Sequence, residues 1–161
     1  KGVEVVVEAC GRLGLPLKVA GSGPELSNLK SQTSNLKSIE FLGWVSDKER
    51  VKLLQNAKAL IVASEDEDFG ITSIEAQAAG IPVIAPRSGG FLETVIDEKT
   101  GLLYGESGQV NVDSLVRVMG EFREDKFKPE DLRKNAQNFS KERFKKEILE
   151  LVEKNLTKKD S

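Results

Sequence analysis

The chain has 161 residues, of which 39% are hydrophobic, so it is long enough to bury one core and short for two. Its 24 Lys and Arg nearly balance 26 Asp and Glu, and the net charge of -2 excludes a global field that would recruit nucleic acid or an anionic membrane. Histidine is absent, which excludes Ser-His and Cys-His nucleophiles and the usual histidine-based zinc sites. We expect one domain over residues 1–156 and a frayed tail at 157–161.

Cysteine content and hydropathy bear on the cellular location. Cys10 is the only cysteine and cannot form an internal disulfide. No apolar run approaches the ~20 residues that a membrane-spanning helix needs. These features predict a cytoplasmic protein.

Short β-branched runs alternate along the chain with segments of helical period. This alternation predicts a doubly wound, Rossmann-like α/β fold with parallel strands and helices on both faces. A strand would normally precede the first helix of such a unit, so we expect that the first strand is missing from the chain. Helices are expected at 3–14, 24–34, 46–57, 71–79, 113–124 and 130–156, the last interrupted near 138–140, and strands at 15–20, 38–43, 59–64, 82–86 and 100–104.

Local signals support several of these boundaries. SDKE at 46–49 is a capping box, and Gly80 followed by Ile81 and Pro82 is a helix stop. The last helix should carry Phe144, Ile148, Leu151 and Val152 as one apolar stripe.

Three loops should lie where ligands bind in a parallel sheet, beyond the carboxyl ends of the strands. They are GSGP at 21–24, EDEDFG at 65–70 and RSGG at 87–90. Glycine permits close approach of the backbone, and a helix N-terminus presents unpaired amides, so phosphate or sugar oxygens would fit here. A simple turn is an equally good explanation of the glycines.

The acids at 65–75 have several possible roles. A hydrated metal ion would need ligands in a geometry that nothing here supplies, so we expect no metal site. Glu65 and Asp66 are expected to be solvated. For Glu75 the residues alone leave two alternatives open, a capping box with Thr72 or a ligand for hydroxyl groups.

Residues 65–104 read EDEDFGITSIEAQAAGIPVIAPRSGGFLETVIDEKTGLLY, which resembles the signature segment of the family 4 glycosyltransferases. Glu67 and Glu75 have that family's spacing of two glutamates, and a Gly-x-Pro-Val strand, Gly-Gly-x-x-Glu and Thr-Gly-Leu-Leu follow in order. VAGSGP at 19–24, IEFLGWVSDKE at 39–49 and the Lys-Gly pair at 1–2 also resemble the family. EDFG with GGFLETVI is similar to mannosyltransferases of bacterial polysaccharide assembly.

The resemblance implies the C-terminal, donor-binding half of a retaining, metal-independent hexosyltransferase with the GT-B fold. The donor would be a nucleotide diphosphate-sugar, GDP-mannose or a UDP-sugar, and no cofactor is implied. The partner would be an N-terminal acceptor-binding domain, through which the full enzyme could associate peripherally with a membrane. Alone, this chain should be inactive. In the family the strand before Lys1 is central, so its absence would leave a gap between the strands near Leu15 and Ala59.

The resemblance also implies roles for single residues. Glu75 would accept hydrogen bonds from the ribose hydroxyls, and Glu67 would face the transferred sugar. The catalytic pair would be Glu67 and Lys1, with Lys1 neutralising the diphosphate as it leaves. The remaining donor-binding positions are Phe69, Gly70 and Ile71 through their amides, Gly21, Gly23 and Val45 around the base, and Gly89 and Gly90.

Two other functions remain as alternatives. A non-catalytic module that binds nucleotide-sugars would share the donor site, and only the acceptor side separates it from a transferase. A GT-B-like sugar-nucleotide epimerase would normally need histidine, which this chain lacks.

Overall fold

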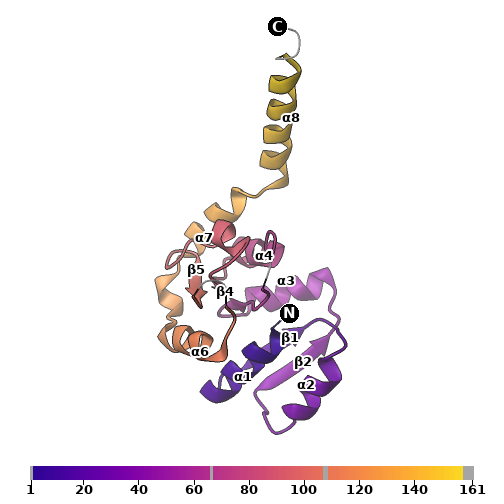
Figure 1. Ribbon diagram of the computed structural model, residues 1–161, viewed down its shortest axis with the longest axis vertical. Coiled ribbons are helices and arrows are strands. Elements are labelled where there is room, and N and C mark those ends of the chain that lie inside the picture. Colours follow the sequence, from indigo (N-terminus) through magenta and orange to yellow (C-terminus); the bar gives the residue numbers. More distant parts are fainter. Residues whose placement is uncertain (1, 66, 107–108, 158–161) are drawn as a thin grey trace.

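The computed structural model describes residues 2–65, 67–106 and 109–157, and its element order confirms the predicted alternation of helices and strands (Figure 1). Two short elements, α5 and the 3-10 helix η1, were not predicted. The elements are α1 (Val3–Leu13), β1 (Leu17–Ala20), α2 (Leu26–Gln32), β2 (Ile39–Gly43), α3 (Asp47–Gln55), β3 (Leu60–Ile61), α4 (Ile71–Ala79), β4 (Val83–Pro86), α5 (Phe91–Thr94), β5 (Gly101–Tyr104), α6 (Val112–Glu121), η1 (Glu124–Lys126), α7 (Pro129–Gln137) and α8 (Lys141–Thr157).

Local signals set the ends of several helices where the sequence predicts them. The hydroxyl of Ser46 accepts a hydrogen bond from the Glu49 amide, and the Glu49 carboxylate accepts one from the Ser46 amide, which completes the capping box of α3. Gly80 ends α4 in the left-handed conformation, with φ of 87°. The break before α8 also lies where expected, and the hydroxyl of Ser140 accepts a hydrogen bond of 3.3 Å from the Arg143 amide at the start of this helix.

The parallel strands form two separate sheets. β1 pairs with β2, and β3, β4 and β5 form a second sheet in that order. Among the described residues no strand pairing joins β1 to β3, so the expected gap between these strands is present. The fold is α/β with parallel strands, as predicted.

Helix α1 packs against both sides of this gap. Its buried residues Val6, Ala9 and Cys10 belong to a core cluster against which Leu17 of β1 and Ile61 of β3 also pack. The valines of α1 therefore serve a buried face, and packing outweighs their modest helix propensity. A second core cluster lies between α4 and the three-stranded sheet and includes Ala76, Val83 and Phe91.

Helix α8 extends away from the rest of the described chain (Figure 1). The predicted stripe is present on it, and Phe144, Ile148, Leu151 and Val152 are between 43% and 64% exposed. Within the parts of the chain that are described, no helix has the length and apolar character required to cross a membrane.

Candidate functional site

The loops after β1 and β2 meet at the carboxyl ends of these strands. The Gly21 amide donates a hydrogen bond of 2.7 Å to the Gly43 carbonyl. A Cβ atom built on Gly21 or Gly23 would have no neighbour within 4 Å, so the backbone there borders open space. Val45 is half-buried in the second of these loops. The structure thus groups Gly21 with the loop that leads to Val45.

Glu67 is half-buried in the loop between β3 and α4, where its own turn holds it. Its Oε1 accepts a hydrogen bond of 3.2 Å from the Gly70 amide, and its Oε2 accepts one of 3.3 Å from the Ser64 hydroxyl. The Gly70 amide, which we predicted as a sugar or phosphate donor, is therefore already engaged. Among the described residues the amides of Phe69 and Ile71 have no hydrogen-bond acceptor.

The glycines at 89 and 90 lie directly against the Glu67 loop. The Gly90 amide donates a hydrogen bond of 2.7 Å to the Glu67 carbonyl. A Cβ atom on Gly90 would lie 2.5 Å from both the Asp68 carbonyl oxygen and the Phe69 Cα atom. Close packing of two backbones explains this glycine, and the contact brings Glu67, Phe69 and Gly90 together.

Two buried hydroxyl groups tie these loops to each other, and sequence reasoning missed them. Ser73 donates to the Gly70 carbonyl at 2.6 Å, and Thr94 donates to the Gly90 carbonyl at 3.0 Å. The two hydroxyl oxygens lie 3.0 Å apart, and both residues are fully buried. The signal available in the sequence was that Ser73 and Thr94 each follow a glycine of the predicted site at helical spacing.

Glu75 lies in the middle of α4, so the capping-box alternative is wrong. The N-cap of α4 is Gly70, which provides no side-chain cap. Instead, Glu75 Oε1 forms an ion pair of 3.1 Å with Nη2 of Arg50 from α3, and its side chain is 32% exposed. Sequence reasoning did not single out Arg50.

Other predicted residues lie outside this group or outside the described part of the chain. Lys1 and Asp66 are not among the described residues. The neighbour of Lys1, Gly2, is so close to the carbonyl of Ala63 that a Cβ atom would come within 2.1 Å of its oxygen. Arg87, at the start of the RSGG loop, is exposed and pairs with Asp97.

Aromatic and acidic residues around the site are mostly engaged elsewhere or exposed. Trp44 is 78% exposed. The ring of Phe69 packs edge-on against Phe139, with centroids 5.9 Å apart. Glu65 is exposed, as expected, and accepts a hydrogen bond of 3.4 Å from the Val110 amide.

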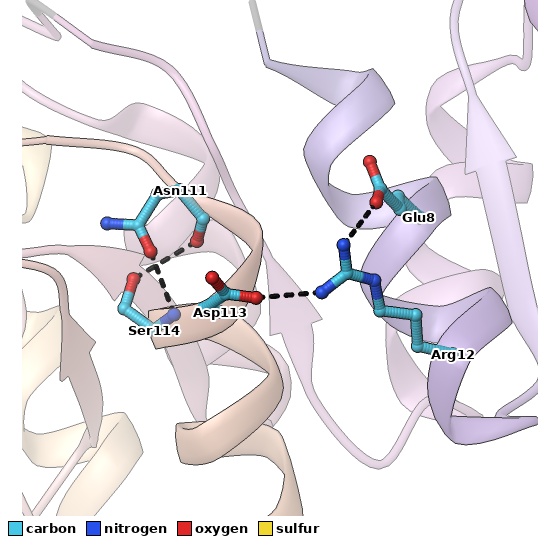
Figure 2. Close-up of polar contacts among 5 residues, drawn as sticks. All are labelled: Glu8, Arg12, Asn111, Asp113 and Ser114. Atoms are coloured by element: carbon cyan, nitrogen blue, oxygen red, sulfur yellow. Dashed lines mark hydrogen bonds and ion pairs between the residues drawn. The ribbon is translucent and has the colours of Figure 1, made fainter.

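A separate hollow of about 390 Å³ lies near the start of α6 and was not predicted. Three of its polar side chains, those of Asn111, Asp113 and Ser114, have partners within the protein. Asn111 caps α6 by accepting from the Ser114 amide at 2.8 Å, and Asp113 binds Arg12 of α1 at 2.7 Å (Figure 2). The contact between Asp113 and Arg12 joins α6 to α1, which favours a structural role for the polar residues of this hollow. The hollow is lined by Gly105, Glu106, Gln109, Asn111, Asp113, Ser114 and Arg117.

Comparisons with known proteins bear on the family and the fold of this chain. The family model of "Glycosyl transferases group 1" matches residues 1–139. The D-inositol 3-phosphate glycosyltransferase of Corynebacterium urealyticum is 30% identical over 167 residues, which cover 94% of this chain and 39% of that protein. The chain thus spans well under half the length of this relative.

Two solved structures show the same fold. The sucrose-phosphate synthase of Thermosynechococcus elongatus superimposes with a TM-score of 0.83 at 26% identity, over 98% of this chain and 43% of that one. The pneumococcal O-GlcNAc transferase GtfA, solved in complex with UDP and GlcNAc, has a TM-score of 0.68 at 25% identity, over 97% of this chain and 32% of that one. Because the family model spans most of the sequence and the fold agrees, this chain belongs to the family of group 1 glycosyl transferases.

Proposed function

We propose that this chain is the donor-binding half of a retaining, metal-independent glycosyltransferase that moves a hexose from a nucleotide diphosphate-sugar. The observation that carries the proposal is a set of two half-buried carboxylates in a chain of this family: Glu67, bound to the Gly70 amide at the start of α4, and Glu75 in the middle of that helix. The UDP and GlcNAc bound to pneumococcal GtfA support a nucleotide-sugar as ligand. GDP-mannose and UDP-sugars are the candidate donors.

Glu75 is assigned to the ribose. Charge-assisted hydrogen bonds from two hydroxyls to one carboxylate would contribute roughly 1.5–3 kcal/mol each. Arg50 occupies Oε1 by an ion pair, and Oε2 has no hydrogen-bond partner among the described residues. The carboxylate thus keeps capacity to accept hydroxyl groups.

Glu67 is assigned to the transferred sugar. A carboxylate offers about four lone-pair positions, and the two hydrogen bonds to Gly70 and Ser64 use only part of this capacity. The amides of Phe69 and Ile71, at the positive end of α4, would meet sugar or phosphate oxygens. The backbones of Gly89 and Gly90 pack closely against the backbone of this loop.

The reaction would depend on stabilising charge on the leaving group. As the glycosidic bond breaks, negative charge grows on the diphosphate, and Lys1 would neutralise it there, which lowers the barrier more than it strengthens binding. Gly21, Gly23 and Val45 would border the base. An acceptor-binding domain would complete the enzyme, so we propose that this chain alone binds a donor weakly and transfers nothing.

The first test is a binding measurement with matched variants. We expect one of UDP-, GDP- or ADP-sugars to raise the melting temperature of the purified protein, because a ligand that prefers the folded state stabilises it. Glu75→Ala should then weaken nucleotide binding about tenfold or more in calorimetry while the unliganded melting temperature changes little. Glu121→Ala, which removes an exposed carboxylate at the end of α6, should bind as the parent does.

The same experiment separates the proposal from a structural role of Glu75. Unchanged nucleotide affinity with a large loss of stability in Glu75→Ala would show that the carboxylate only holds α3 against α4. Sugar transfer by the 161-residue chain without a partner would contradict the assignment to a donor-binding half.

A further inference from the structure

Arg50 makes a contact that links two different helices at the candidate site. It lies near the start of α3, and its Nη2 atom is 3.1 Å from Glu75 Oε1 in the middle of α4. The same Nη2 atom is 3.1 Å from Oδ1 of Asp47, one turn earlier in α3. One guanidinium therefore lies between a carboxylate of its own helix and the carboxylate that we assign to the ribose.

The two carboxylates differ in their access to solvent. The Asp47 side chain is 92% exposed, whereas that of Glu75 is only 32% exposed. A carboxylate that has lost much of its hydration needs an opposite charge more than an exposed one does. Of the two ion pairs that the Arg50 guanidinium makes, the one with Glu75 is therefore the more important.

The backbone of Arg50 lies in a hydrogen-bonded turn at the start of α3. Its amide donates a hydrogen bond of 2.8 Å to the Ser46 carbonyl, in the turn that the capping box of Ser46 and Glu49 closes. An arginine side chain is planar and permanently charged, so it can hold a carboxylate in one orientation. With Oε1 engaged by Arg50, the Oε2 atom of Glu75 is the one left for a new hydrogen bond.

We propose that Arg50 is a positioning residue that holds Glu75 in the orientation in which it accepts hydrogen bonds from the ribose hydroxyls of the donor. This inference rests on the proposed function, which places Glu75 on the ribose. It predicts that Arg50 affects the recognition of the ribose in particular, and not nucleotide binding in general.

The test compares a nucleotide with its analogue that lacks both ribose hydroxyls. The probe is UDP, GDP or ADP, whichever binds the purified protein most tightly, and it is compared by calorimetry with the 2′,3′-dideoxy form of the same nucleotide. Arg50→Gln should weaken binding of the ribonucleotide about fivefold and leave the affinity for the dideoxy analogue unchanged. Arg50→Lys should restore part of the preference, because it keeps the charge without the planar geometry.

Lys52→Gln is the matched control. It removes one positive charge from the same helix, away from the Glu75 ion pair, and should keep the preference for the ribonucleotide. A general electrostatic effect of the charge change would instead lower the affinity of both variants for both ligands, and would overturn the role of Arg50.

The outcomes distinguish this inference from the proposed function. If the parent protein binds none of UDP, GDP and ADP, or does not prefer the ribonucleotide, the proposed function fails and the role of Arg50 fails with it. If the parent prefers the ribonucleotide and Glu75→Gln abolishes this preference while Arg50→Gln keeps it, Glu75 is assigned correctly and the role of Arg50 is overturned. Tighter ribonucleotide binding by Arg50→Gln would also overturn it, because Arg50 would then compete with the ribose.

Discussion

The two carboxylates of the candidate site are held in different ways. Glu67 is held by Ser64 and Gly70, which are three residues away on either side, so its environment follows from the local turn. Glu75 is held by Arg50, which reaches it from another helix. The sequence motif therefore predicted both acids, while their hydrogen-bond and ion-pair partners came from the structure.

Cys10 shows what burial does to a single ionisable side chain. It is 1% exposed in α1, and burial raises the pKa of its thiol from 9.0 to about 11. The folded state therefore favours the neutral thiol. This contribution to stability is fully present below pH 9.0 and is lost as the pH rises towards 11.

We expect Cys10 to resist thiol reagents in the native protein. At about pH 8 its reaction with a disulfide reagent should be at least about 100-fold slower than in the urea-unfolded chain. The buried thiol is protonated at this pH, and the reagent cannot reach it. In a Cys10→Ala background, Lys18→Cys places a thiol on β1 at a position where the lysine side chain is 62% exposed. This thiol should react at once, and equally fast reaction of native Cys10 would show that α1 opens readily.

Elements whose ends depend on local hydrogen bonds were the best predicted. The start of α3 lies at its capping box and the end of α4 lies at Gly80, both as expected. The short α5 was missed because its position depends on contacts with distant segments. The Gly90 amide reaches the Glu67 carbonyl, and Thr94 meets Ser73 of α4.

The capping box of α3 makes stability depend on pH. Hydrogen bonds from the Ser46 side chain and backbone lower the pKa of Glu49 below its ordinary 4.5. A lowered folded-state pKa means that the stabilisation is present above pH 4.5 and is lost as the pH falls through the folded value. In denaturant unfolding, the stability difference between the parent and Glu49→Gln should therefore shrink in acid.

Two further variants separate the capping box from other effects. Ser46→Ala should lower the free energy of unfolding by about 1 kcal/mol at neutral pH. Glu130→Gln is the control, because Glu130 lies in the first turn of α7, where no side chain caps the helix. If Glu130→Gln lost as much stability as Glu49→Gln, the helix dipole and not the capping box would be responsible.

At the scale of the whole molecule, α1 packs in one core cluster with residues of both sheets. Among the described strands, β1 pairs with β2 alone and β3 pairs with β4 alone. The amides of Leu60 and Val62 donate hydrogen bonds to the carbonyls of Pro82 and Ile84. The amide of Ile61, which lies between them in the strand, therefore points to the opposite side. Ile61 is only partly buried, and its amide lacks a strand partner among the described residues.

Hydrogen exchange can test this arrangement in the 161-residue chain. We expect the amide of Ile61 to exchange much faster than those of Leu60 and Val62, because only the latter are hydrogen-bonded to another strand. Nuclear magnetic resonance would measure the three rates in one experiment. Equally slow exchange of Ile61 would mean that another strand covers this edge, from a second copy or another polypeptide.

The sequence by itself determined the class of the fold, most element boundaries and the two acids of the candidate site. Hydrophobic period, caps and glycine stops act over a few residues, and the spacing of Glu67 and Glu75 is part of one continuous motif. These features act within one segment and do not depend on which segments meet in the folded protein.

The tertiary structure alone decided which groups surround those acids. Arg50 approaches Glu75 because α3 packs beside α4, and Ser73 meets Thr94 because the loop after β4 lies on the loop after β3. Such contacts depend on how buried apolar faces orient whole helices, and many different sequences can satisfy them. The ends of the parallel strands bring the loops together, and the side-chain partners are settled only by that packing.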